Sequence, residues 1–285
     1  MVEMLVSKMA RNADHQVVVE LEDRIAWVRI NRPEKRNAIS PALAAKMAET
    51  LDALELDERC AVVVLTGTGA AFHAGMDLKE FFRATDSMPA DARRRLSEIN
   101  SDWQWRRLLY YAKPTIAMVN GYCFGGGLNP VCACDIAIAA EEATFGVSEV
   151  NWGIVPAGNV LKLLSWVLSP RDGMWVAMSG EPFSGKKAAE MRLVNEAVPL
   201  AKLKERTREI ALSFVGKNPY AVRATKHAFH RVRDMNFEDS EDYLFAKLAE
   251  SRLQDPEKGR DKGMSQFLDE KSFRPGLGTY KREPG

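Results

Sequence analysis

Three short apolar runs alternate with helical segments in the first half of the chain, and this alternation constrains the fold more than any other feature. The runs cover residues 60–66, 114–119 and 135–139. Apolar runs of this length, bounded by turn residues, are typical of buried strands. Strands that alternate with helices favour a layered arrangement of both elements. The pattern therefore predicts an α/β fold.

Helical periodicity dominates the second half. Residues 16–21 and 25–30 are β-rich and predict a hairpin, and Ser40-Pro41 predicts the start of a helix that runs to about Leu56. Further helices are predicted near residues 158–168, 171–179, 186–192, 200–215, 219–233 and 238–253. We expect a flexible tail over 1–15, one core over 16–200 and a helical region over 201–285, which packs on the core or on a neighbouring subunit.

Composition narrows the classes of partner. The 285 residues carry 46% hydrophobic and 28% charged side chains and a formal net charge of +1, which gives no general electrostatic case for nucleic acid or anionic membranes. The first 15 residues hold no long apolar run, so neither a signal peptide nor a membrane span is expected there. The four cysteines lack C-x-x-C spacing and are expected to be free buried thiols in the cytoplasm. They are Cys60, Cys123, Cys132 and Cys134.

Residues 180–187 nearly match a phosphate-binding loop, G-x-x-x-x-G-K-[ST]. Lys187 stands at the last position and offers no hydroxyl group to magnesium, and a helix, not a strand, is predicted before the motif. We interpret the segment as a connection between helices, with Ser184 capping the second one.

Two strand–turn–helix corners contain glycine. Gly125-Gly126-Gly127 follows the run 114–119, and Gly75 lies in a turn after the run 60–66. Glycine lets a ligand approach backbone amides at a helix N-terminus, and two such amides suit a developing oxyanion. Tight packing explains a glycine run equally well.

The catalytic base is expected to be a carboxylate. The four histidines form no H-E-x-x-H motif, and no G-x-S-x-G surrounds a serine, so a metal site and a serine triad are not expected. Glu149 lies among apolar residues and glycines, where the pKa of a carboxyl group rises towards neutral pH. A glutamate that caps a helix or forms a salt bridge is the alternative.

Several segments together resemble the crotonase (enoyl-CoA hydratase/isomerase) superfamily over about residues 16–270. They are NRPEKRNAIS (31–40), TGTGAAFHAGMDLKE (66–80), KPTIAMVNGYCFGGG (113–127), CDIAIAAEEATFGVSEVNWGIVP (134–156) and AAEMRLVNEAVP (188–199). The resemblance implies a spiral of ββα units, C-terminal helices that form trimers, and often a dimer of trimers. Arg192 stands where many members have glycine, which puts the local turn in doubt.

The resemblance also implies a site for a coenzyme A thioester. The amides of Met76 and Gly126 would form the oxyanion hole, and Glu149 would be the base. Coenzyme A is part of the substrate, and no separate cofactor is implied. The residues implied along the coenzyme A path are Lys35, Arg36, Ala38, Ala74, Met76, Leu78, Ser148 and Trp152.

One position separates this chain from ordinary hydratases of the superfamily. These use a second glutamate two residues after the glycine run, where this chain has Asn129. An amide is no general base. The chain looks most like hydroxycinnamoyl-CoA hydratase-lyases of the feruloyl-CoA type, in which that position is usually serine.

The implied reaction is hydration of an arylpropenoyl-CoA of the feruloyl, coumaroyl or cinnamoyl type, followed by retro-aldol cleavage to an aromatic aldehyde, such as vanillin, and acetyl-CoA. Two alternatives stay open. One is a hydratase or isomerase of another acyl-CoA, and the other is a non-catalytic crotonase-fold protein that binds RNA through the basic helix 219–233.

Related lyases tend to carry tyrosines that contact the phenol of the substrate. This chain has Phe81 and Phe245 at those positions, with Tyr243 nearby. We expect an aryl pocket without phenol partners and a preference for rings that lack a free 4-hydroxyl group. In the alternative interpretation both phenylalanines are ordinary core residues.

Overall fold

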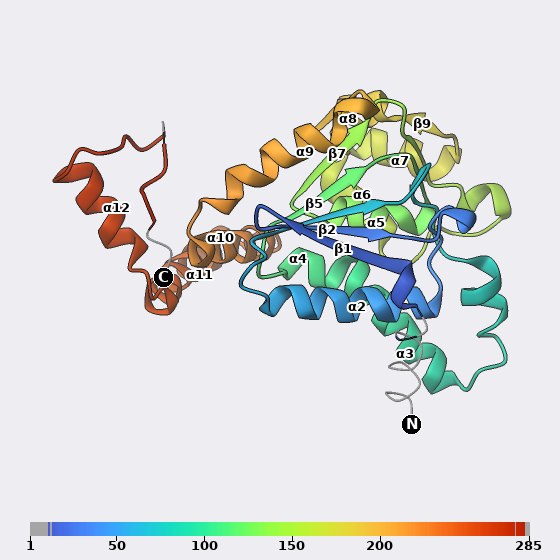
Figure 1. The fold of residues 1–285 in the computed structure, drawn as a ribbon. Helices are drawn as coiled ribbons and strands as arrows, with labels where there is room; N and C mark the ends of the chain where they lie inside the picture. Colours follow the sequence, from blue (N-terminus) through green and yellow to red (C-terminus); the bar gives the residue numbers. More distant parts are fainter. Residues whose placement is uncertain (1–10, 12, 277, 283–285) are drawn as a thin grey trace.

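Two sheets form the centre of the molecule (Figure 1). The structure is a computed structural model that describes residues 11, 13–276 and 278–282, so most of the predicted tail over 1–15 lies outside it. The six-stranded sheet has the order β1 (Val17–Glu22), β2 (Ile25–Ile30), β3 (Val62–Gly67), β5 (Thr115–Val119), β7 (Ile136–Ala140) and β10 (Glu196–Val198). The four-stranded sheet has the order β4 (Ala71–His73), β6 (Tyr122–Phe124), β8 (Thr144–Gly146) and β9 (Phe183–Ser184).

Consecutive strands divide between the two sheets. Each of the pairs β3–β4, β5–β6 and β7–β8 gives one strand to each sheet and is followed by a helical segment. In the six-stranded sheet the strands β2, β3, β5, β7 and β10 run parallel, whereas β1 pairs with β2 in an antiparallel hairpin. This repetition confirms the predicted α/β spiral of ββα units.

Helices cover the six-stranded sheet on both faces. The first is α2 (Pro41–Leu56), where the Ser40 hydroxyl accepts from the Leu43 amide at 3.1 Å, as the sequence predicts. The others in the core are α3 (Ala90–Ser101), α4 (Arg107–Tyr110), α5 (Leu128–Ala133), α6 (Val160–Val167), α7 (Pro170–Ser179), α8 (Gly185–Glu190) and α9 (Leu200–Val215). α9 packs against β3, β5 and β7, and α2 and α4 lie on the opposite face (Figure 1).

The strands β3 and β5 are buried along their whole length, as expected for central strands that are covered by helices on both faces. The short helical turn η4 (Asp102–Arg106) brings Trp103 and Trp105 into the core between α3 and α5. The apolar centre therefore reaches the second sheet and the glycine corners next to it.

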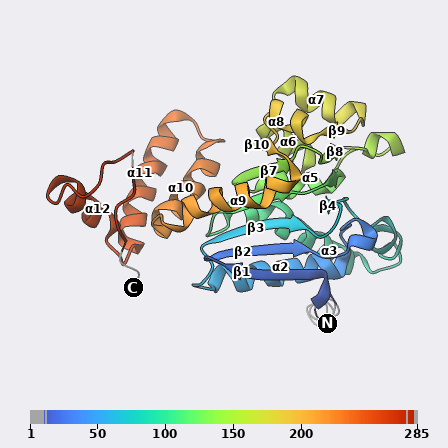
Figure 2. The ribbon, with the colours of Figure 1, turned by 45° about the horizontal axis from the view of Figure 1, so that its top comes forward.

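The last helices form an arm that leaves the core. The arm comprises α10 (Pro219–Val232), α11 (Phe237–Gln254) and α12 (Gly259–Leu268), and both views show it beside the core and not on top of it (Figures 1 and 2). The buried Lys226 links the arm to the core, because its ammonium group donates to Asp135 Oδ2 at 2.8 Å. The last helix predicted from the sequence covers residues 238–253, so α12 was not predicted.

The segment 180–187 and the turn at Arg192 can be compared with their predicted structures. The segment 180–187 connects α7 to α8 through the two-residue strand β9, and Ser184 accepts from the Lys187 amide at 3.2 Å, so the predicted cap is confirmed. Arg192 adopts a left-handed conformation with φ +67, so the turn survives without glycine. No helix among the described residues has the length and apolarity that a membrane crossing requires.

Candidate active site

The first glycine corner exposes the amide of Met76. On either side of it, the Gly75 carbonyl accepts from the Ile39 amide and the Asp77 amide donates to the Ile39 carbonyl, both at 2.9 Å. In extended backbone, successive amides point to opposite sides, so the Met76 N–H points away from Ile39. Gly75 makes the turn possible with φ +88.

The second corner meets the first. Gly125 adopts φ +53 and opens the turn η5 (Gly125–Gly127), which continues into α5. A Cβ atom built on Gly75 would lie 3.0 Å from the Phe124 carbonyl oxygen and 3.7 Å from the Gly126 nitrogen. The two predicted oxyanion corners therefore lie side by side.

Tight packing also acts at the glycine run. A Cβ atom on Gly127 would lie 2.2 Å from the carbonyl oxygen of His73, so no side chain fits there. Gly127 is therefore required for packing, whereas Gly126 lies where the two corners meet.

Glu149 faces the same glycines. It begins the turn η6 (Glu149–Trp152), and a Cβ atom on Gly125 would lie 2.8 Å from its Oε1. Within the described residues, Oε2 is buried without a hydrogen-bond partner and the carboxylate forms no ion pair. Burial raises the pKa of the Glu149 carboxyl group above its ordinary value of 4.5. This geometry favours a proton-transferring group over a salt-bridged one.

Asn129 lies on α5 and is buried. Its Nδ2 donates to Gln104 Oε1 at 3.3 Å and to the Gly158 carbonyl at 3.2 Å. Gln104 Nε2 in turn donates to Asn100 Oδ1 at 2.6 Å, and Asn100 Nδ2 approaches the Met76 sulfur at 3.4 Å. The three buried amides thus connect Asn129 to Met76.

Two side chains that the sequence analysis missed support the first corner. His73 is fully buried, stacks on Trp103 with ring centroids 5.9 Å apart, and accepts from the Gly75 amide through Nδ1 at 3.0 Å. Burial lowers the pKa of His73 to about 3, which keeps the ring neutral and Nδ1 able to accept.

Arg32 is the other missed residue. From a buried position its guanidinium donates to the Ala38 carbonyl at 2.7 Å and to Glu80 Oε1 at 2.8 Å, and it approaches Asp77 Oδ2 at 3.5 Å. Arg32 therefore joins the loop before α2 to the segment that follows Met76.

The residues implied for the coenzyme A path fall into two groups. Lys35, Arg36 and Ala38 lie on the loop that pairs with the strand end at Ala74, whose amide donates to the Arg36 carbonyl at 3.1 Å. The Arg36 guanidinium lies over the Tyr122 ring at 5.2 Å. Leu78 is exposed next to the first corner.

Ser148 directly precedes Glu149, and Trp152 ends the turn η6. Trp152 is exposed, together with Ile154 and Val155. A cavity of about 660 Å³ opens beside this segment and is lined mainly by apolar residues of η6, α6 and α7.

Within a single chain, the two phenylalanines predicted to line the aryl pocket, Phe81 and Phe245, lie apart. Phe81 is buried in the turn η3 (Leu78–Arg83), whereas Phe245 is 66% exposed on α11. The reason is that α11 packs on α10, in the arm that leaves the core. Tyr243 lies on the same helix, half-buried.

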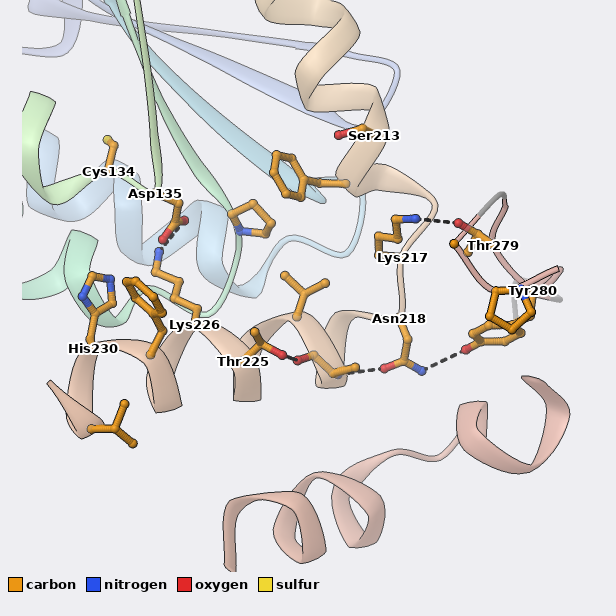
Figure 3. Close-up of a pocket in the computed structure, with 18 of the residues that line it drawn as sticks. Cys134, Asp135, Ser213, Lys217, Asn218, Thr225, Lys226, His230, Thr279 and Tyr280 are labelled. Atoms are coloured by element: carbon orange, nitrogen blue, oxygen red, sulfur yellow. Dashed lines mark hydrogen bonds and ion pairs between the residues drawn. The ribbon is translucent and has the colours of Figure 1, made fainter. Parts of the chain in front are cut away.

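A larger cavity lies elsewhere in the described part of the chain. It measures about 1390 Å³ and opens between α10, the end of α9 and the segment near Tyr280, with the Lys226–Asp135 pair in its wall (Figure 3). Glu149, whose carboxyl group has a raised pKa, and the two glycine corners lie outside this cavity. The four cysteines are buried and unpaired.

A family model described as enoyl-CoA hydratase/isomerase matches residues 20–274. The chain belongs to this family. It is 55% identical over 266 residues to a hydroxycinnamoyl-CoA hydratase-lyase of Pseudomonas fluorescens, covering 93% of this chain and 96% of the other.

Other family members are more distant. A 2,3-dehydroadipyl-CoA hydratase of Escherichia coli is 31% identical, covering 90% of this chain and 97% of the other. The crystal structure of an enoyl-CoA hydratase from Bacillus anthracis superposes with a TM-score of 0.80 at 26% identity, covering 94% of this chain and all of the other. These matches confirm the fold and the family predicted from the motifs.

Proposed function

We propose that this enzyme hydrates an arylpropenoyl-CoA thioester and cleaves the product by a retro-aldol step to an aromatic aldehyde and acetyl-CoA. The observation that carries the proposal is the single unpaired carboxylate of Glu149 beside the two glycine corners. The 55% identity to a hydratase-lyase along nearly the whole chain supports the lyase over a plain hydratase.

Hydration begins with the thioester carbonyl between the amides of Met76 and Gly126. Glu149 takes a proton from water while the oxygen bonds to the β-carbon, and the electrons of the double bond move to an enolate that the two amides stabilise. Glu149 then returns the proton to the α-carbon. The raised pKa of this carboxyl group suits it to both transfers.

Cleavage uses the same groups. Glu149 takes the proton of the β-hydroxyl group, the bond between the α- and β-carbons breaks, and its electrons form the enolate of acetyl-CoA as the aldehyde leaves. Glu149 then protonates this enolate. One oxyanion hole serves both steps because both pass through an enolate at the same carbonyl. These steps move only protons and electron pairs, so the reaction needs no cofactor besides the coenzyme A of the substrate.

The remaining assignments follow this reaction. Lys35 and Arg36 bind the phosphates of coenzyme A, and Ala38, Ala74, Leu78, Ser148 and Trp152 line its path. Phe81 forms one wall of the aryl pocket. Phe245 and Tyr243 reach that pocket from another copy of the chain, since their own helix stands away from it.

We propose a homotrimer or a dimer of trimers. The arm exposes apolar side chains such as Phe237 (90%), Leu253 (88%) and Phe229 (70%), which a subunit interface would cover. Free thiols at all four cysteines suit a cytoplasmic enzyme.

An RNA-binding role for α10 is less favoured. Lys226 points inward to Asp135, and His227 contacts the Tyr110 carbonyl at 2.7 Å, so part of the basic stripe of this helix is turned towards the core.

The decisive experiment is incubation with feruloyl-, coumaroyl- and cinnamoyl-CoA, with products identified by mass spectrometry. We expect an aromatic aldehyde and acetyl-CoA. Hydrated thioester without any aldehyde would show a plain hydratase instead, and thioesters that neither bind nor react, together with RNA retained on a filter, would favour the RNA-binding protein.

A further inference from the structure

A fixed acceptor determines the orientation of the Asn129 amide. Its Nδ2 lies 3.2 Å from the carbonyl oxygen of Gly158. A backbone carbonyl only accepts hydrogen bonds, so the nitrogen and not the oxygen of the Asn129 side chain must face Gly158.

Gln104 imposes the same orientation from the other side. Its Nε2 donates to Asn100 Oδ1 at 2.6 Å and lies 3.9 Å from the Met76 sulfur, so its Oε1 is turned to Asn129. Gln104 is only 1% exposed, and water does not compete for these contacts. Both hydrogens of Asn129 Nδ2 are therefore occupied, by Gln104 and by Gly158.

The oxygen of the same amide accepts no hydrogen bond from any described residue. Among the residues that the structure describes, Asn129 Oδ1 and Glu149 Oε2 are both buried acceptors without a partner. Both side chains border the second glycine corner, since a Cβ atom on Gly126 would lie 4.0 Å from Asn129 Nδ2 and one on Gly125 would lie 2.8 Å from Glu149 Oε1. A water molecule, with two hydrogens, satisfies two such acceptors.

We propose that Gln104 is a positioning residue that fixes Asn129 as a hydrogen-bond acceptor for the water that Glu149 activates. This inference rests on the proposed function. In hydration, one hydrogen of the water passes to Glu149, the oxygen bonds to the β-carbon, and the second hydrogen stays on the oxygen and points to Asn129 Oδ1.

The same orientation acts differently on cleavage. The β-hydroxyl group has one hydrogen, and this must pass to Glu149 before the carbon–carbon bond breaks. Asn129 Oδ1 then faces the forming aldehyde oxygen with no hydrogen between them. An acceptor at this position therefore assists hydration more than cleavage, whereas a donor assists cleavage.

A double-mutant cycle tests the role of Gln104. Gln104→Met keeps the length of the side chain and removes both polar atoms. With the parent residue at 129, we expect kcat for hydration to fall roughly 2–10-fold, as for the loss of one hydrogen bond, with KM unchanged. In Asn129→Ala the same change should have no further effect. A full additional loss in that background would overturn the proposal, because it would show that Gln104 acts without Asn129.

Gln104→Glu is the matched control. In its protonated form, which burial favours, it keeps an acceptor towards Asn129 and a donor towards Asn100, so hydration should return close to the parent rate. Failure of this rescue at a pH where the variant keeps the parent thermal midpoint would contradict the orientation argument.

The ratio of products tests whether a donor at position 129 assists cleavage, as the orientation argument requires. Asn129→Ser provides a hydroxyl group that can donate, and Asn129→Ala provides nothing. We expect the ratio of aldehyde to hydrated thioester to be roughly 2–10-fold higher for the serine variant than for the alanine variant. Equal ratios would overturn the assignment.

Crystal structures of the parent and of Gln104→Met decide the proposal without turnover. We expect a water molecule within hydrogen-bond distance of both Asn129 Oδ1 and Glu149 Oε2 in the parent and not in the variant. An unchanged water in the variant would refute the role of Gln104. A parent that turns over no arylpropenoyl thioester would refute the proposed function, while the crystallographic comparison still decides this inference.

Discussion

A Gly125→Ala substitution tests whether catalysis depends on the position of the Glu149 carboxylate. Its effect on catalysis can be distinguished from its effect on the stability of the fold. The new methyl group would lie 2.8 Å from Glu149 Oε1, whereas ordinary contact begins at 3.4 Å, so the carboxylate must move by about 0.6 Å. This movement is inexpensive for the fold because it affects the end of a flexible side chain. It is costly for catalysis, since a misplacement of about 1 Å can lower a rate roughly 10²-fold.

The backbone contributes a second, separable cost. Gly125 adopts φ +53, and a left-handed conformation costs a residue with a side chain about 1–2 kcal/mol. For a chain of this size that corresponds to a fall in thermal midpoint of about 2–4 °C per kcal/mol. Gly153 is the matched control, because it has φ +69 and a Cβ atom there would meet nothing within 4 Å.

We expect Gly125→Ala and Gly153→Ala to lose similar stability in thermal unfolding. Only Gly125→Ala should lose kcat, by at least roughly 10-fold. Steady-state kinetics with an arylpropenoyl thioester and thermal scans on the same preparations measure both quantities. If Gly125→Ala kept the parent kcat, or if both variants lost kcat equally, the placement of Glu149 as the base beside the glycine corner would be wrong.

Three further predictions concern the base, the aryl pocket and the buried histidine. Glu149→Gln should lower kcat roughly 10²–10⁴-fold while calorimetry shows thioester binding unchanged, and near-parental turnover would refute its role as base. The parent should prefer 4-methoxy or unsubstituted cinnamoyl-CoA to the 4-hydroxy thioester, because a buried hydroxyl group without a partner costs about 1–3 kcal/mol, or roughly 5–150-fold in kcat/KM. Phe81→Tyr with Phe245→Tyr should reverse this order; a parent that strongly prefers the 4-hydroxy substrate and is unaffected by the tyrosines would contradict the pocket. For His73, the folded pKa of about 3 lies below the unfolded value of 6.5, so the unfolded chain binds more protons between these pH values and stability falls as the pH drops through 6.5. The slope should approach about 1.4 kcal/mol per pH unit in denaturant titrations, and His73→Asn, which keeps an acceptor for the Gly75 amide, should show a smaller slope; equal slopes would refute the assignment.

Local signals predicted the framework of the site. The start of α2 was predictable because the Ser40 hydroxyl accepts from an amide only three residues further along the chain. Glu149 was recognisable because the residues around it, 145–153, are mainly apolar residues and glycines. The motifs around Met76 and Gly126 predicted the family and the spiral, and the comparisons confirmed both. Features that are decided by neighbours along the chain are readable in one sequence.

The supporting residues were not predictable in this way. Gln104 contacts Asn129 across 25 positions, and Arg32 contacts Glu80 across 48. Neither contact follows from periodicity, capping or composition. Phe245 and Phe81 do not meet within one chain, so the predicted aryl pocket depends on the proposed contact with another copy of the chain.

A trimer formed through the arm would make the enzyme sensitive to dilution. In the proposed trimer, the apolar side chains of α10 to α12 leave water only when subunits meet, so part of the folding free energy depends on mass action. The thermal midpoint should then rise with protein concentration. Enzyme diluted to nanomolar levels for an assay would lose subunit contacts first, and with them the walls that Phe245 and Tyr243 provide to a neighbouring site. Specific activity would therefore fall on dilution well before the core around Glu149 unfolds.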